Sequence, residues 1–117
     1  MTNQIKNAKI VSTHLGYEEH GIFTAYIRFE GAGWGVVMGG EVLDKPTDKG
    51  RVLGRRGAAL IPEILKVVGV DTWEDLPGKY VRVEDEDLGN KVTKFGHLMD
   101  DIWLDFDSFF KQKNEGD

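Results

Sequence analysis

The residues best suited to hold a ligand are arginines that alternate with glycines. Arg51, Arg55 and Arg56 lie within six residues of one another, directly before an apolar segment with helical spacing. The first turn of a helix presents unpaired N–H groups and the positive end of the helix dipole, and arginine binds phosphate oxygens at two points. The segment therefore predicts an anion site, although neither a phosphate-loop signature nor a Gly-x-Gly-x-x-Gly pattern is present. The alternative is a flexible loop whose arginines are solvated or pair with nearby acids.

Further basic and aromatic side chains extend this candidate site. Alternation along residues 22–29 places Arg28 on the polar face of a strand, and Arg82 shares a strand face with Tyr80. Aromatic rings beside these strands are candidates for stacking on a base, with a core or rim position as the alternative. The predicted ligand-binding residues are Arg28, Arg55, Arg56, Arg82, Tyr17, Tyr26, Trp34 and His97.

The signals for metal binding and catalysis are weak. His14, His20 and Glu18 can meet at the mouth of a hairpin, but no His-Glu-x-x-His spacing or calcium-loop pattern is present. The chain has no cysteine and no Gly-x-Ser-x-Gly elbow, so no nucleophile stands out. We therefore expect neither a metal, nor a cofactor, nor enzymatic activity. The alternative is a small enzyme that pairs His97 or His20 with a carboxylate.

Composition narrows the class of protein. The 117 residues carry a formal charge of −5, are 40% hydrophobic and include 15 glycines but no cysteine. This length fits one domain, 1–117, with residues 1–7 and 111–117 expected to be flexible. Disulfide frameworks and thiolate zinc sites are excluded, and no apolar run is long enough for a membrane span, so a cytoplasmic location is expected. The acidic balance makes nucleic acid an improbable partner, and runs such as 84–87 predict a solvated face or a mimic of phosphate charge.

Hydrophobic periodicity predicts an α+β domain with a mostly antiparallel sheet and one main helix. The order is β-β-β-α-β-β, followed by a short C-terminal helical turn at 102–110. Strands are expected at 9–14, 22–29, 34–43, 79–84 and 91–98, with a bulge at Gly39-Gly40, and 44–50 is expected to be a loop. The helix spans 54–68 and ends at Gly69, and Pro62 predicts either a later start near Ile61 or a kink.

A set of short segments resembles a widespread family of small phage and prophage proteins, mostly of unassigned function. These segments are 16–22, 39–40, 68–70, 73–74, 78–83, 96–97 and 101–105. In size and α+β make-up the chain is similar to the anti-Thoeris sponge proteins of phages. That similarity implies a homo-oligomer that sequesters a cyclic ADP-ribose isomer or a cyclic oligonucleotide without catalysis.

Two functions of different class follow from these observations. The first is a phage-type counter-defence protein that binds a nucleotide signal through its arginines and aromatic side chains. The alternative is an inhibitor that docks on a host defence complex, in the manner of anti-CRISPR proteins, through its acidic surface.

Overall fold

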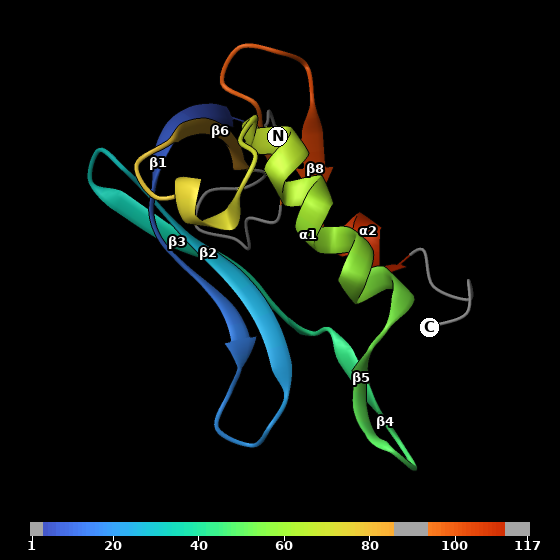
Figure 1. Cartoon of the computed structure of the whole chain (residues 1–117). Coiled ribbons are helices and arrows are strands. Elements are labelled where there is room, and N and C mark those ends of the chain that lie inside the picture. Colours follow the sequence, from blue (N-terminus) through green and yellow to red (C-terminus); the bar gives the residue numbers. More distant parts are fainter. Residues whose placement is uncertain (1–3, 86–93, 112–117) are drawn as a thin grey trace.

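The chain folds as an α+β domain built on one antiparallel sheet, as the sequence predicts (Figure 1). The structure, a computed structural model, describes residues 4–85 and 94–111. In chain order the elements are β1 (Gln4–Tyr17), β2 (Phe23–Gly31), β3 (Trp34–Val42), β4 (Asp44–Thr47), β5 (Gly50–Leu53), α1 (Arg55–Val68), the 3-10 turn η1 (Trp73–Asp75), β6 (Tyr80–Asp85), β7 (Lys94–Gly96), β8 (Trp103–Asp105) and α2 (Phe106–Lys111). The main sheet has the order β3-β2-β1-β6-β7-β8, and β4 and β5 form a separate hairpin. No helix in the described part of the chain is long and apolar enough to cross a membrane.

One face of the sheet carries the hydrophobic core and lies against α1 (Figure 1). The alternating side chains of β2 show why, because Ala25, Ile27 and Phe29 are buried while Arg28 between them is exposed. From α1, Leu60 and the apolar residues that follow it at helical spacing pack onto this face. Burial of these side chains is the main force that holds the helix on the sheet.

Helix α1 begins at Arg55 and runs through Pro62, so a later start near Ile61 is wrong. Proline removes one helical hydrogen bond and so destabilises the helix. Burial of the apolar face on both sides of Pro62 offsets this loss of stability. Gly69 ends the helix as predicted, with a φ of 90° and its N–H bonded to the carbonyl of Leu65.

The bulge predicted at Gly39-Gly40 is confirmed. Between Thr24 and Tyr26 of β2 the register on β3 moves from Val42 to Gly39, so β3 contains one extra residue. Gly39 and Gly40 have φ angles of 103° and 92°, a conformation that side-chain-bearing residues rarely adopt.

Three expectations about elements need correction. Residues 4–7 are not loose but form the start of β1, paired with β6. The predicted loop 44–50 belongs to a hairpin, and the C-terminal segment contains β8 before the short helix α2. The start of β1 pairs with a strand that is distant in the sequence, and β4 and β5 form a ribbon of mostly exposed residues. The local pattern of apolar residues therefore does not identify them as strands. Of the predicted strand 91–98, residues 94–96 form β7 and 91–93 lie outside the described residues, as does the expected flexible tail at 112–117.

Candidate functional site

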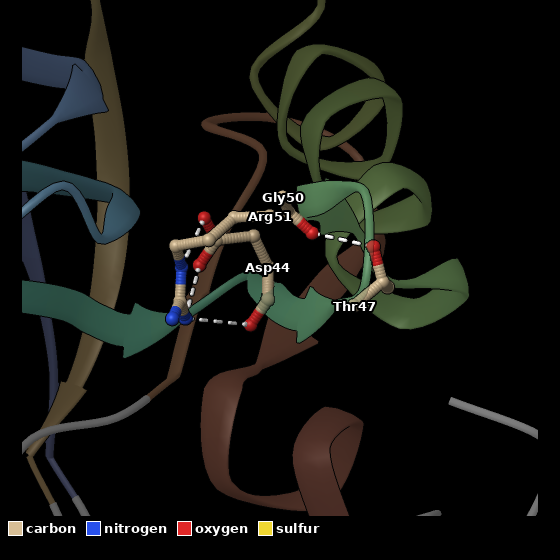
Figure 2. Close-up of polar contacts among 4 residues, drawn as sticks. All are labelled: Asp44, Thr47, Gly50 and Arg51. Atoms are coloured by element: carbon tan, nitrogen blue, oxygen red, sulfur yellow. Dashed lines mark hydrogen bonds and ion pairs between the residues drawn. The ribbon is translucent and has the colours of Figure 1, made fainter.

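The arginines before α1 do not form the single anion site that their spacing predicts. The guanidinium of Arg51 donates from Nε to Oδ2 of Asp44 at 2.9 Å and from Nη2 to Oδ1 at 3.0 Å (Figure 2). Arg56 donates to the backbone carbonyl of Phe109 at 3.1 Å, whereas Arg55 is exposed at the start of the helix. The alternative stated for this segment, arginines paired with nearby acids, therefore holds for Arg51.

The Asp44–Arg51 pair fixes the base of the β4–β5 hairpin. The Asp44 side chain is buried, and the hydrogen bonds from Arg51 hold the pKa of its carboxyl below the usual value. Figure 2 also shows Thr47 donating to the carbonyl of Gly50 at the turn end of the same ribbon. The ion pair and this turn contact are the polar interactions that tie the two strands together through side chains.

This pair predicts a defined pH dependence of stability. Because the folded pKa of Asp44 is lowered, its contribution is fully present above the unfolded value of about 3.9 and disappears as the pH falls through the folded pKa. We expect the Asp44→Asn variant to melt several degrees below the wild type at neutral pH. The two melting temperatures should converge in strong acid, and a difference that stays constant with pH would contradict the ion-pair account.

The face of the sheet that points away from α1, here called the open face, gathers several predicted site residues. Register places Tyr26 and Arg28 of β2 on this face, together with Lys9 and His14 of β1. Arg82 of β6 lies on the same face, opposite Asn7. No member of the hydrophobic core lies here, and no helix of the described residues covers it (Figure 1).

A hollow of about 250 Å³ lies at one end of the open face, beneath the turn between β1 and β2. The residues that line it are Glu18, Glu19, His20, Ile22, Thr24, Gly40 and Val42. Thr24 is almost fully buried and donates from Oγ1 to Oε2 of Glu18 at 2.6 Å. The carboxylates of Glu18 and Glu19 in this lining favour hydroxyl and amine donors over phosphate. Within the described residues, no three ligating side chains come close enough to hold a metal ion.

Next to this hollow, β2 presents a line of three different chemical groups. Thr24, Tyr26 and Arg28 follow one another on the open face at intervals of about 7 Å. The Tyr26 ring stacks on His14 with centroids 5.0 Å apart, and its other neighbour across the strands is Gly39, which has no side chain. The line therefore runs from hydrogen-bonding groups at the hollow, past an aromatic ring, to a cation.

Arg28 is the most accessible cation on this line. Its side chain is 53% exposed, and it makes one long contact of 3.5 Å from Nε to Oε2 of Glu30. Exposed pairs of this kind contribute little free energy, so an incoming anion can replace Glu30 at low cost.

Arg82 and His97, also predicted to bind ligand, make contacts within the fold. Arg82 donates to the carbonyls of His97 at 2.9 Å and Asp100 at 2.8 Å, and its guanidinium lies over the Trp103 ring at 4.8 Å. His97 accepts backbone N–H bonds at Nδ1 from Met99 and Asp100. Both residues thus shape the turn 97–102.

The two remaining aromatic residues of the predicted set lie away from the open face. Trp34 packs against the core from β3, with Lys6 over its ring at 5.5 Å. Tyr17 ends β1, is 66% exposed, and contacts Phe23 edge to face at 5.0 Å between centroids. Of the eight predicted residues, Tyr26, Arg28 and Arg82 lie on the open face, and Arg82 is held there by contacts to the turn 97–102. The other five lie elsewhere.

No protein-family model, curated protein or solved structure matches the chain. The candidate site consequently rests on its own geometry.

Several residues of the site were not singled out from the sequence as ligand contacts. Thr24 and Gly40 line the hollow, and Gly39, the partner of Tyr26 on β3, brings no side chain to that position. The bulge predicted at Gly39-Gly40 is the sequence signal that bears on this position. Its proximity to Tyr26 depends on the register between β2 and β3, which the sequence does not specify.

Proposed function

We propose that the protein is a non-catalytic binding protein that holds a nucleotide along β2 on the open face of its sheet. The observation that carries this proposal is the line of Thr24, Tyr26 and Arg28 beside a hollow lined in part by Glu18 and Glu19. The line, two intervals of about 7 Å, leaves room for a base at one end and a phosphate at the other.

The three groups suit a ligand with a base near the hollow and a phosphate at the far end. Arg28 pairs with a phosphate, since arginine binds its oxygens at two points. Tyr26, backed by His14, offers a ring on which a base stacks. Glu18, already fixed by the Thr24 hydroxyl, accepts hydrogen bonds from an amino group on the edge of that base. Repulsion by Glu18 and Glu19 keeps the phosphate at the Arg28 end, so the orientation is defined.

A thermal-shift screen tests this proposal. Cyclic ADP-ribose isomers, cyclic dinucleotides and simple adenine nucleotides are added to purified protein, and a ligand at 100 times its Kd raises stability by about 2.7 kcal/mol. We expect Arg28→Glu to weaken the binding of the nucleotide found in this screen by at least about tenfold, because a charge-assisted hydrogen bond contributes about 1.5–3 kcal/mol.

The matched control is Lys66→Glu, an equal change of charge on the exposed side of α1. It should bind as the wild type does, whereas Arg55→Glu reports on the alternative site at the start of α1. A panel without any stabilising nucleotide, or an Arg28→Glu protein with unchanged affinity, would count against the proposal.

The resemblance to small phage proteins supplies the biological setting of this proposal. In that setting the protein is a counter-defence sponge in the host cytoplasm that removes a nucleotide immune signal, a cyclic ADP-ribose isomer or a cyclic oligonucleotide. Protein incubated with such a signal, freed of excess by gel filtration and then heated, should release it unchanged. Release of a hydrolysed product instead would indicate an enzyme.

A second candidate function, an inhibitor that docks on a host defence protein, is favoured by the β4–β5 hairpin. The hairpin extends from the body of the molecule (Figure 1) and exposes Val52 and Leu53 to 43% and 44%. Exposed apolar side chains on a projecting ribbon suit a protein partner. Retention of a specific host protein that is lost with Val52→Lys would favour this function, whereas a sponge needs no host protein.

A further inference from the structure

Strand β3 forms one edge of the main sheet and is long enough to accept another strand. Within the described residues it pairs only with β2, so half of its backbone groups point away from the sheet. The register of β2 and β3 can be counted from the two-residue turn between Gly31 and Trp34. In this register, Gly35 and Val37 are the residues whose backbone N–H and C=O groups point away from β2. This edge therefore offers N–H donors and C=O acceptors to a partner strand.

The edge lacks the devices that usually prevent such pairing. Residues 34–40 contain no charged side chain and no proline, although the whole chain carries a formal charge of −5. Val37 is 49% exposed on the open face, with Arg28 and Glu30 of the neighbouring strand held in a pair of opposite charges. An edge of this composition does not repel a second copy of itself.

The segment is also complementary to itself in the antiparallel direction. Two copies of β3 that pair antiparallel are related by a two-fold axis. If this axis passes through Val36, Gly35 of each copy lies opposite Val37 of the other, and the backbone groups of both residues point toward the second copy. The missing side chain of Gly35 then leaves room for the exposed Val37 side chain of the second copy. Beyond this stretch, the bulge at Gly39 and Gly40 turns the strand away and limits the pairing to 34–38.

We propose that two copies of this chain pair antiparallel through β3, with the axis at Val36, and so join their sheets into one. The pairing stands whether or not the open face binds a nucleotide. The pairing joins the open faces of the two copies into one surface. The two β2 strands are then separated by three strand spacings, about 14 Å. The two Arg28 side chains flank the axis on the same face.

Cysteine crosslinking tests the register, since the wild-type chain contains no cysteine. At the axis, Val36→Cys places two Cα atoms about 4.5 Å apart, within the range for a disulfide. Val37→Cys is its matched partner, because its Cα atoms lie on a diagonal of about 7–8 Å and should crosslink poorly. Crosslinking through position 37 but not position 36 would overturn the Val36-centred pairing.

Sedimentation without any ligand tests the dimer itself. We expect a dimer for the wild type and a monomer for Val37→Lys, which places a charge opposite the second copy. Val52→Lys is the matched control, since Val52 has a similar exposure of 43% on β5 and should leave the dimer intact. Melting curves of both variants will show whether they fold. A monomeric wild type would overturn the proposal. Since Arg28→Glu leaves β3 unchanged, its failure to alter nucleotide binding bears on the proposed function alone.

Discussion

The Gly57→Ala variant is expected to be less stable than the wild type, although alanine is the better helix former. In a helix interior, alanine is favoured over glycine by about 1 kcal/mol. At this position, however, an added Cβ would lie 2.3 Å from the carbonyl oxygen of Leu43 and 2.8 Å from its Cβ. These atoms belong to a segment that cannot move aside, because the same carbonyl accepts a hydrogen bond from Gly54 and the Leu43 side chain is buried in the core.

The cost of overpacking a tight contact is about 1–3 kcal/mol or more. Since the contact at Gly57 involves backbone, we expect a net loss of about 2 kcal/mol in the free energy of unfolding, measured by urea denaturation. Ala59→Gly, an exposed site on α1, supplies the control: it should lose about 1 kcal/mol through helix propensity alone. A Gly57→Ala protein more stable than the wild type would show that α1 does not pack on Leu43 in this way.

Elements with a strong local pattern could be predicted from the sequence. Period-2 alternation identified β2 and the outward position of Arg28, and helical spacing with a terminal Gly69 identified α1. In both elements the residues that determine the structure are neighbours in the sequence. The α+β class followed from the order of these segments.

Elements that depend on distant partners could not be predicted. Residues 4–7 are polar and become strand only because β6, some 75 residues later, pairs with them. The hairpin at 44–53 is held by the Asp44–Arg51 ion pair and its turn rather than by buried side chains, so it lacks a hydrophobic signature. Pro46 also favours the prediction of a loop, because proline is rare inside sheets. A two-stranded ribbon with solvent on its sides tolerates that residue.

The candidate site was only partly predictable, for a similar reason. Periodicity gave the face of Arg28, and the nature of the side chain suggested a role for Tyr26. The grouping of both with Thr24 and the hollow required the registers of β1, β2 and β3. Conversely, spacing alone made Arg51 and Arg56 look like an anion site, whereas the fold supplies each with an intramolecular acceptor.

Arg82 is expected to be the most important cation for stability. Its Nε and Nη2 atoms donate to the carbonyls of His97 and Asp100, two acceptors that lie 15 and 18 residues further along the chain. Hydrogen bonds to charged groups contribute about 1.5–3 kcal/mol each, and contact with the Trp103 ring adds to them. We expect Arg82→Ala to lower the free energy of unfolding by about 3 kcal/mol.

Arg82→Lys should recover little of this loss, because an ammonium group is a point charge that cannot reproduce the planar fork spanning two carbonyls. Hydrogen exchange should show the turn 97–102 opening in both variants before the rest of the sheet. Arg28→Ala is the matched control on the same face, with an expected change within about 0.5 kcal/mol because its side chain is exposed. If Arg82→Ala is as stable as Arg28→Ala, the two carbonyl contacts do not hold the turn.

This difference determines which arginine can test nucleotide binding. A loss of affinity in Arg82→Ala would follow from a displaced turn as readily as from a lost phosphate contact. Among the described residues, Arg28 contacts Glu30 alone, at 3.5 Å, so its replacement should leave the fold unchanged and report on the ligand. We therefore expect the two variants to separate the roles that the sequence assigned to them jointly: Arg82 should affect stability, and Arg28 should affect binding.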